Sequence, residues 1–318
     1  MSQQAIPSAA PQARRGASLS AGEARLAYMM LAPTVLIVLL IVILPVLWTI
    51  WMSLREVRLI DLQRANLWTP EFTIANYLTV LRGRNFLPVF QTTLIYTIGG
   101  SLLAILGGLA AALLVNEKFP GRNVFRGFLL FPYIAPVVAV AFTWRMMLNA
   151  QFGIVNQLLD QRIDFFAQRF ITLSLFGLEL RWPLALSMVI LFEGWRYFPF
   201  AFLFFLARLQ ALPDELYEAA AVDGAVPSQR FWYITLPQLS GVFATLFLLR
   251  FIWTFNKFDD IYLLTGGGAG TEIITVQIYE YLTGRNNIGA ASALAVVLAL
   301  FLIILVPLYV RFVAREDN

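Results

Sequence analysis

Three long stretches of the chain contain no charged residue and are rich in Leu, Ile, Val and Ala. A helix needs about 20 predominantly apolar residues to cross a bilayer, and each stretch exceeds that length. The pattern therefore predicts transmembrane helices at residues 26–54, 86–116 and 286–311. The first stretch is longer than the apolar part of a secretion signal, and no clear cleavage site follows it. We therefore expect it to stay in the protein as a helix.

Three further stretches are apolar but contain isolated charged residues, and they predict spans at 124–148, 182–207 and 237–264. A charged side chain at the bilayer centre costs about 2.5–3.5 kcal/mol on insertion scales, and it is tolerated where it faces a helix bundle or a wet cavity. We therefore expect an all-α membrane protein with six transmembrane helices, in which these charges face inward. The residues concerned in the last two spans are Glu193, Arg196, Arg250, Lys257, Asp259 and Asp260.

The segments between the predicted spans are short or polar. Residues 1–25 are rich in Ser, Ala, Gln and Pro and have no apolar period, which predicts a disordered tail. Residues 55–85 and 149–181 are amphipathic and contain aromatic side chains, so we expect small interfacial helices there. Lys and Arg are distributed almost evenly between the two sides of the spans. The excess of positive charge that usually marks the cytoplasmic side therefore does not set the orientation.

The composition agrees with a membrane protein and removes several kinds of chemistry. Hydrophobic residues make up 59% of the 318 residues and charged residues 13%, whereas soluble domains average roughly 45–50% and 25%. The absence of Cys and His excludes cysteine nucleophiles, histidine-based triads and most zinc sites. We expect no catalytic residue and no metal site. The net charge of +4 comes from scattered residues, which argues against nucleic-acid binding.

The segment between the fourth and fifth predicted spans has the signals of two short helices. Pro213 suits a first helical position, and the two acidic residues that follow, from Asp214, complement the helix dipole. Gly224 is a natural helix C-cap. Pro227 begins a second helix, which we expect to end near Pro237.

The same segment carries a spaced motif. Glu218-Ala219-Ala220 is followed by Gly224 and then by Ile234 and Leu236-Pro237. This spacing resembles the EAA loop of the permeases of binding-protein-dependent ABC importers. The resemblance implies the type I ABC importer permease fold, with a cytoplasmic coupling-helix loop at 208–236. It also implies cytoplasmic N- and C-termini in a bacterial inner membrane.

Further motifs make the resemblance more specific. Phe131-Pro-Tyr-Ile-Ala-Pro136 and Phe152-Gly-Ile-Val-Asn156 look like the third span and following loop of sugar-importer permeases. Phe255-Asn256, Phe258-Asp259 and Leu264-Thr-Gly-Gly-Gly268 resemble the first, larger permease of maltose-type importers, in the carbohydrate uptake 1 group. One departure is Ala269, where that family commonly has Pro.

The resemblance implies an assembly. The expected partners are a second transmembrane permease subunit, two cytoplasmic ATPase subunits, an extracytoplasmic solute-binding protein and membrane lipid. ATP and Mg²⁺ would be bound by the ATPase subunits and no cofactor by this chain, since its glycines at 266–270 lack the Lys-Ser/Thr of a phosphate-binding loop. The residues implied in coupling to the ATPase are Glu218, Ala219, Ala220, Asp223, Gly224, Ala225, Phe231, Ile234, Leu236 and Pro237.

The resemblance also implies that a sugar passes the middle of the fourth and fifth spans. Aromatic rings suit the faces of sugars, and charged or amide groups suit their hydroxyls. A local excess of cationic side chains suggests an anionic sugar, whereas the alternative is that these charges pair with one another. The implied pathway residues are Glu193, Arg196, Tyr197, Phe200, Arg250, Thr254, Asn256 and Lys257.

Three other interpretations stay open at this point. An ABC importer permease for another small polar solute would share the EAA loop. An ion-coupled secondary transporter would need no ATPase partner, and the loop from Glu218 to Pro237 would have no evident role in it. A membrane-embedded enzyme would have to rely on Asp, Glu, Ser or Tyr, and no paired carboxylates stand out for that purpose.

Overall fold

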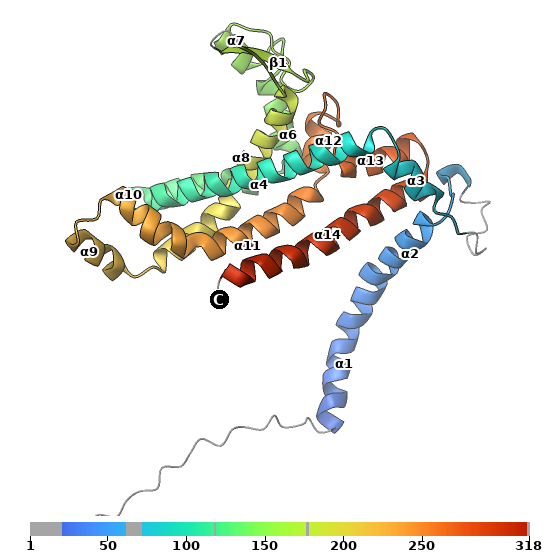
Figure 1. Cartoon of the computed structure of the whole chain (residues 1–318), viewed down its shortest axis with the longest axis horizontal. Coiled ribbons are helices and arrows are strands. Elements are labelled where there is room, and N and C mark those ends of the chain that lie inside the picture. Colours follow the sequence, from blue (N-terminus) through green and yellow to red (C-terminus); the bar gives the residue numbers. More distant parts are fainter. Residues whose placement is uncertain (1–20, 62–71, 118, 176–177, 317–318) are drawn as a thin grey trace, which may run out of the picture. The chain divides into compact units, whose positions relative to one another are not determined.

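The computed structural model describes residues 21–61, 72–117, 119–175 and 178–316, and helices dominate it (Figure 1). Most of the tail predicted at 1–25 lies outside the described residues. The chain divides into two compact units, Met1–Thr49 and Ile50–Asn318. Among the described residues, five helices are long and apolar enough to cross a membrane, and a bent helix pair would make a sixth span.

The first apolar stretch forms one long helix. Helix α1 (Ala21–Val38) continues through the π-helical turn η1 (Leu39–Ile43) into α2 (Leu44–Ser53). The candidate span runs from Ala24 to Ser53, and none of the residues in its apolar window is buried. A helix that is apolar on all sides and unburied within its own chain suits an environment of lipid.

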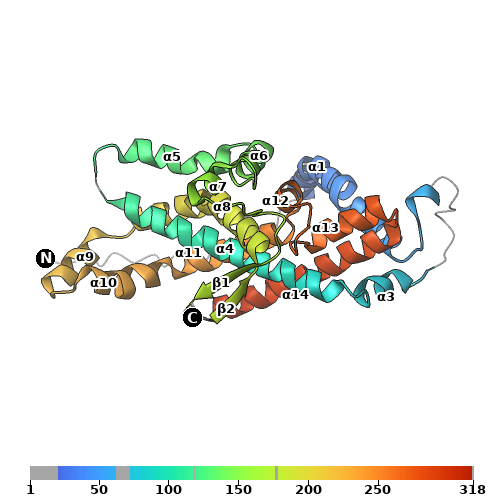
Figure 2. The ribbon, with the colours of Figure 1, turned by 90° about the horizontal axis from the view of Figure 1, so that it is seen from above.

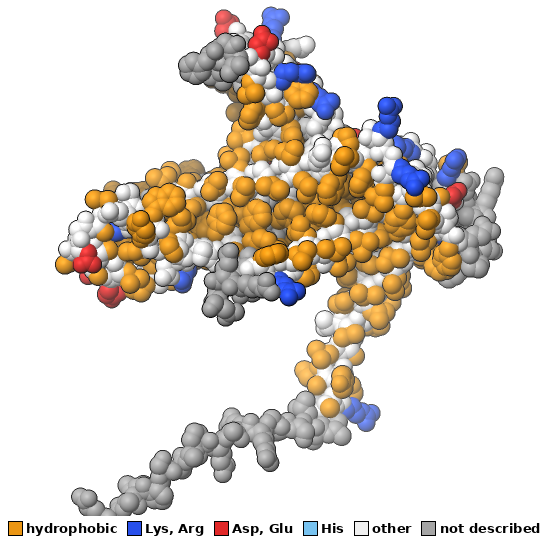
Figure 3. Space-filling model, viewed as in Figure 1, with side chains coloured by type: hydrophobic (Ala, Val, Ile, Leu, Met, Phe, Trp, Pro, Cys, Tyr) orange, Lys and Arg blue, Asp and Glu red, His pale blue; other side chains and the backbone are white. Residues whose placement is uncertain are grey.

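Four long helices form the centre of the second unit: α4 (Phe86–Asn116), α8 (Leu184–Gln210), α11 (Leu236–Phe255) and α14 (Ile288–Glu316). α4 runs along α8, and α11 packs against α4, α8 and α14 (Figures 1 and 2). Hydrophobic side chains cover the visible face of these helices, whereas charged side chains gather at their ends and on the loops (Figure 3). Helices that cross a bilayer show this distribution.

Glycines bring α4 and α8 close together. A Cβ on Gly100 would lie 2.6 Å from Cγ of Glu193, and one on Gly108 would lie 2.6 Å from Cβ of Ala201. Contacts this short do not occur between real atoms, so both positions require glycine. Membrane helices commonly associate through small residues because these let the backbones approach. The contact places Glu193 of α8 directly against α4.

The predicted span at 124–148 is broken into two helices. α5 (Arg122–Ile134) and α6 (Val137–Met147) meet at an angle of 93°. The break falls at Ala135-Pro136, where Ala135 has extended backbone angles (φ −62°, ψ 141°). Proline has no N–H to continue the helical ladder, and it disfavours helical angles in the residue before it. The sequence therefore contained the signal for this break.

The predicted span at 237–264 also differs from the structure. Helix α10 (Pro227–Arg230) continues through the π-helical turn η3 (Phe231–Thr235) into α11, which ends at Phe255. The helix therefore does not stop near Pro237, because the π-helical turn directly before this proline adjusts the backbone around its missing N–H. A break at 256–258 separates α11 from α12 (Asp259–Leu264).

The remaining elements are short. α3 (Ala75–Leu81), η2 (Leu59–Asp61) and α7 (Ile154–Leu159) are small helices in the two segments where such helices were expected. The antiparallel hairpin of β1 (Ile171–Leu175) and β2 (Leu178–Trp182) was not predicted. α13 (Ile274–Tyr279) and η4 (Glu280–Gly284) precede α14. We call the end of the unit that carries α7 and the hairpin the hairpin end. The opposite end of α8 carries α9 (Asp214–Val222) and α10.

Candidate functional site

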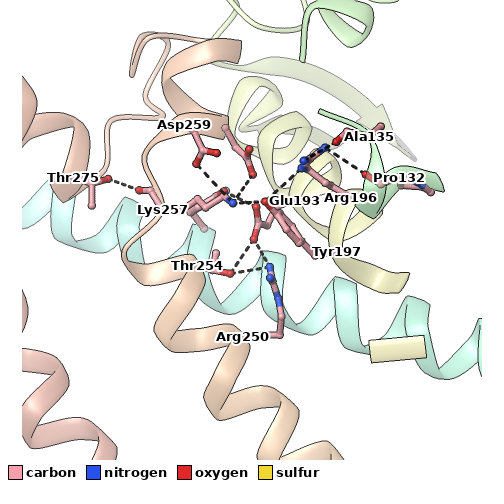
Figure 4. A network of polar contacts seen from close by, with 12 residues as sticks. Pro132, Ala135, Glu193, Arg196, Tyr197, Arg250, Thr254, Lys257, Asp259 and Thr275 are labelled. Atoms are coloured by element: carbon pink, nitrogen blue, oxygen red, sulfur yellow. Dashed lines mark hydrogen bonds and ion pairs between the residues drawn. The ribbon is translucent and has the colours of Figure 1, made fainter. Parts of the chain in front are cut away.

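A buried polar network joins α4, α8 and α11 (Figure 4). Arg250 of α11 forms an ion pair with the Glu193 carboxylate, and both side chains are almost completely enclosed. Thr254 donates a hydrogen bond to Glu193 Oε1 at 2.9 Å, and the Tyr96 hydroxyl donates one to Oε2 at 3.0 Å. The carboxylate is therefore satisfied entirely from within the protein, as a buried charge has to be.

Lys257 extends this network across the break between α11 and α12. Its ammonium donates to the hydroxyl of Tyr197 and lies 4.3 Å from the centre of that ring. The same ammonium is 3.6 Å from Oδ2 of Asp260 and 3.7 Å from Oδ1 of Asp259. Thr275 donates to the backbone carbonyl of Lys257, so this broken segment is also bonded to α13.

The cations of the site are paired. Arg250 is neutralised by Glu193, and Lys257 lies between two aspartates. Arg196 has its guanidinium on backbone carbonyls of α5 and its break, at Pro132 and Ala135. The cationic excess apparent in the sequence is thus offset within the chain.

Aromatic side chains form a continuous surface beside the network. Tyr133 of α5 contacts Tyr197 and Phe200 of α8, with ring centroids 6.0 and 6.2 Å apart. Phe200 also contacts Phe204 at 4.9 Å and Trp253 of α11 at 5.1 Å. We call these five residues the aromatic surface. Tyr133, Phe204 and Trp253 are each more than 40% exposed, so a ligand could reach them.

The eight pathway candidates therefore separate into two groups. Glu193, Arg250, Thr254 and Arg196 are buried, and Asn256 bonds the carbonyl of Ile252 in its own helix. Tyr197, Phe200 and Lys257 are partly exposed. Six residues outside the eight pathway candidates belong to the same region: Tyr96, Tyr133, Phe204, Trp253, Asp259 and Asp260. Asp260 was noted only as a charge, although its side chain is 1% exposed.

The coupling loop has the expected local structure. Helix α9 begins directly after Pro213, and Gly224 has a left-handed backbone (φ 80°). The turn is closed by a hydrogen bond from the Ala225 N–H to the Ala220 carbonyl at 2.9 Å. Tyr217 and Thr235 share a hydroxyl hydrogen bond at 3.0 Å, which ties α9 to η3.

The motif residues of this loop remain accessible. Ala220, Ala225, Phe231, Ile234 and Leu236 are half-buried. The exposed members of the set are Glu218, Ala219, Asp223, Gly224 and Pro237. The loop therefore exposes both small and acidic groups.

The glycine-rich segment at 266–270 forms a defined turn. Gly266, Gly267, Ala269 and Gly270 all have positive φ, with 52° at Ala269. A proline there, as in the family pattern, could not adopt that angle because its ring fixes φ near −65°. This turn and residues of the 145–167 segment line a cavity of about 900 Å³ at the hairpin end. No cluster of three or more metal-ligating side chains occurs among the described residues.

Comparisons with known proteins identify related sequences. The sequence profile of the family described as binding-protein-dependent transport system inner membrane component matches residues 104–316. The trehalose/maltose transport system permease protein MalF of Thermococcus litoralis is 38% identical over 289 residues, covering 87% of this chain and 91% of that protein. The inner membrane ABC transporter permease protein YcjO of Escherichia coli is 33% identical, covering 92% and 95%.

A solved structure has a similar fold. A chain of a bacterial ABC transporter involved in the import of the acidic polysaccharide alginate superposes with a TM-score of 0.77. The alignment covers 92% of this chain and 96% of that chain at 22% identity. At this identity the similarity establishes the fold.

Proposed function

The chain belongs to the family of binding-protein-dependent transport system inner membrane components, and we propose that it is a sugar-translocating permease subunit of an ATP-driven importer. The observation that carries this proposal is the aromatic surface, which lies beside the buried polar network of Glu193 and Arg250. Aromatic faces pack against the apolar C–H faces of sugar rings, and neighbouring hydroxyl and charged groups bond the sugar's hydroxyls. The names of relatives that transport trehalose and maltose support the same class of cargo.

We further propose that the cargo is a neutral sugar or oligosaccharide. An anionic cargo inside the bilayer needs an available cation, because an unpaired charge there is costly. Arg250 and Lys257 already face carboxylates, and Arg196 is bonded to carbonyls. The acidic polysaccharide alginate is the cargo of the structurally similar transporter, whereas the charge balance of this chain favours a different class.

The energy for transport comes, in this proposal, from two ATPase subunits that hold ATP and Mg²⁺, while this chain holds neither and catalyses no reaction. The coupling loop, with exposed Glu218 and Gly224, would dock on one ATPase subunit. A second permease would complete the pathway. The loop and both termini would lie in the cytoplasm, and the hairpin end, with its polar cavity, would face the solute-binding protein.

The test is transport by the assembled importer in proteoliposomes. ATP-dependent uptake of maltose, trehalose and a neutral trisaccharide would be compared with uptake of a uronate trisaccharide, using the cognate binding protein. We expect uptake of at least one neutral sugar and none of the uronate. Uptake of the uronate alone would refute the neutral class, and uptake driven by an ion gradient without ATP would refute the importer.

A further inference from the structure

At the C-terminal end of helix α5, two backbone carbonyl groups have no N–H partner in the helix. In a helix the N–H of residue 136 would bond the carbonyl of residue 132. Residue 136 is proline, which has no N–H. The carbonyl of Pro132 therefore loses its partner as a direct result of the sequence, and the carbonyl of Ala135 follows the last turn of the helix. Unsatisfied backbone groups are expensive in a bilayer, because no water replaces the missing partner.

The side chain of Arg196 supplies hydrogen bonds to both carbonyls (Figure 4). Its Nη1 donates to the Pro132 carbonyl at 3.3 Å, and its Nη2 donates to the Ala135 carbonyl at 3.0 Å. The residue is 7% exposed. The third nitrogen, Nε, lies 3.4 Å from the hydroxyl of Tyr197. All three nitrogens of the guanidinium are thus directed at groups of the protein.

The fork shape of the guanidinium suits this position. Two N–H groups on separate nitrogens reach the two carbonyls at the C-terminal end of α5, those of Pro132 and Ala135, which a lysine ammonium on a single nitrogen does less well. Cations near a helix C-terminus are also favoured by the helix dipole. The Arg196 side chain therefore has a complete structural explanation at the break, without any contact to a cargo.

We propose that Arg196 is a positioning residue, which holds the last turn of α5 on α8 and thereby fixes the 93° bend between α5 and α6, by binding the carbonyls of Pro132 in α5 and Ala135 in the break. The bond to the Pro132 carbonyl also sets the place of the adjacent Tyr133, which lies one residue before the end of α5 and contacts Tyr197 and Phe200. By positioning Tyr133, the Arg196 guanidinium keeps one edge of the aromatic surface in place. The effect of Arg196 on cargo rests on the proposed transport function. The effect of Arg196 on the bend does not, because the bend can be measured without any sugar.

The bend is measured by a distance between spin labels on Phe128→Cys and Met146→Cys, at exposed positions of α5 and α6. The natural chain contains no cysteine, so only these two sites are labelled. In the assembled complex we expect Arg196→Met to broaden the distance distribution about twofold or more, and Arg196→Lys to have an intermediate effect. The matched control is Arg208→Met, because Arg208 also lies on α8 and donates to a backbone carbonyl, that of Gln238. The control should leave the distribution unchanged.

A second measurement removes the proline. Pro136→Ala restores an N–H that can bond the Pro132 carbonyl, so the thermal destabilisation caused by Arg196→Met should be smaller in the Pro136→Ala background. Equal losses in the two backgrounds would overturn the proposal. This cycle also covers the case in which Arg196→Met alone assembles poorly, because Arg196→Lys can replace it in both backgrounds.

Sugar-stimulated ATP hydrolysis separates positioning from direct recognition. A positioning role predicts that Arg196→Lys lowers the maximal rate by about fivefold to tenfold with less than about a twofold change in the half-saturating sugar concentration. An unchanged label distance with a strongly raised half-saturating concentration would identify Arg196 as a sugar ligand and overturn the proposal. If the wild-type importer moves no sugar, the proposed function fails, while the distance measurement still decides the role of Arg196.

Discussion

Glu193 of α8 and Arg250 of α11 form an ion pair whose side chains are 0% and 3% exposed. Both groups carry further hydrogen bonds to Thr254, and Tyr96 completes the set on the carboxylate. Removing one partner from a buried pair leaves an uncompensated charge, which is far more costly than losing both. A single substitution in this pair therefore leaves an unpaired charge buried between two transmembrane helices, whereas a double substitution does not.

Arg250→Met or Glu193→Gln alone should lower the free energy of unfolding by about 3–5 kcal/mol. Arg250→Met combined with Glu193→Gln should lose clearly less than the sum of the two single changes, because no unpaired charge remains. The measurement is denaturant unfolding of the purified complex in detergent. Strictly additive losses would show that the two side chains act independently.

Substitutions in the aromatic surface should act on the cargo and not on assembly. Trp253→Ala removes an exposed ring from α11, so we expect the half-saturating neutral sugar concentration to rise about tenfold, equivalent to about 1.4 kcal/mol. Phe312→Ala on α14, also exposed, serves as the control and should leave it unchanged. The readout is sugar-stimulated ATP hydrolysis by the reconstituted importer. An equal effect of both substitutions would remove the aromatic surface from the pathway.

The coupling loop permits a test that separates hydrolysis from transport. A Cβ on Gly224 would meet nothing within 4 Å, so Gly224→Ala acts only through its left-handed backbone, at a cost of about 1–2 kcal/mol. We expect Gly224→Ala to reduce sugar uptake per ATP hydrolysed, and Gly224→Asn to do so less, because Asn tolerates this conformation. Glu218→Ala should also reduce this ratio while leaving stability unchanged, since its side chain is exposed. Normal sugar uptake per ATP hydrolysed in both Gly224→Ala and Glu218→Ala would contradict the role of the loop.

Ala269 offers a backbone test at the hairpin end. Its φ of 52° is open to glycine but closed to proline. Ala269→Gly should therefore retain the turn, whereas Ala269→Pro should increase hydrogen exchange at residues 262–270. Equal exchange in the two variants would show that the turn adapts to proline. This comparison needs no knowledge of the cargo.

The sequence was sufficient for the long spans and for the start of α9. Uncharged apolar runs identify α4 and α14, and Pro213 with the acidic residues after it locates the start of α9. These features are local, so they can be read from neighbouring residues alone. The break at Ala135-Pro136 was equally local, and the presence of Pro136 in an apolar run was the signal for it. The end of α11 at Phe255 was masked by the apolar residues beyond it, at 261–264.

The arrangement of charges could not be predicted in the same way. Lys257 and Asp260 are neighbours in sequence, but Glu193 and Arg250 are 57 residues apart. Arg196 and the Pro132 carbonyl are 64 residues apart. Whether a cation in a span faces a cargo or a carbonyl depends on how the helices pack. The charged residues of the sequence therefore suggested a cationic pathway, whereas the packed structure pairs Arg250 and Lys257 with carboxylates and bonds Arg196 to backbone carbonyls.

The glycine contacts between α4 and α8 constrain how the subunit can change shape. Gly100 and Gly108 seat side chains of α8 directly on the α4 backbone, with no room for even one added carbon. Helix surfaces that are packed this closely resist sliding past one another. We therefore expect α4 and α8 to move together as one rigid unit. Any change between inward-facing and outward-facing forms would then leave the contact between α4 and α8 intact.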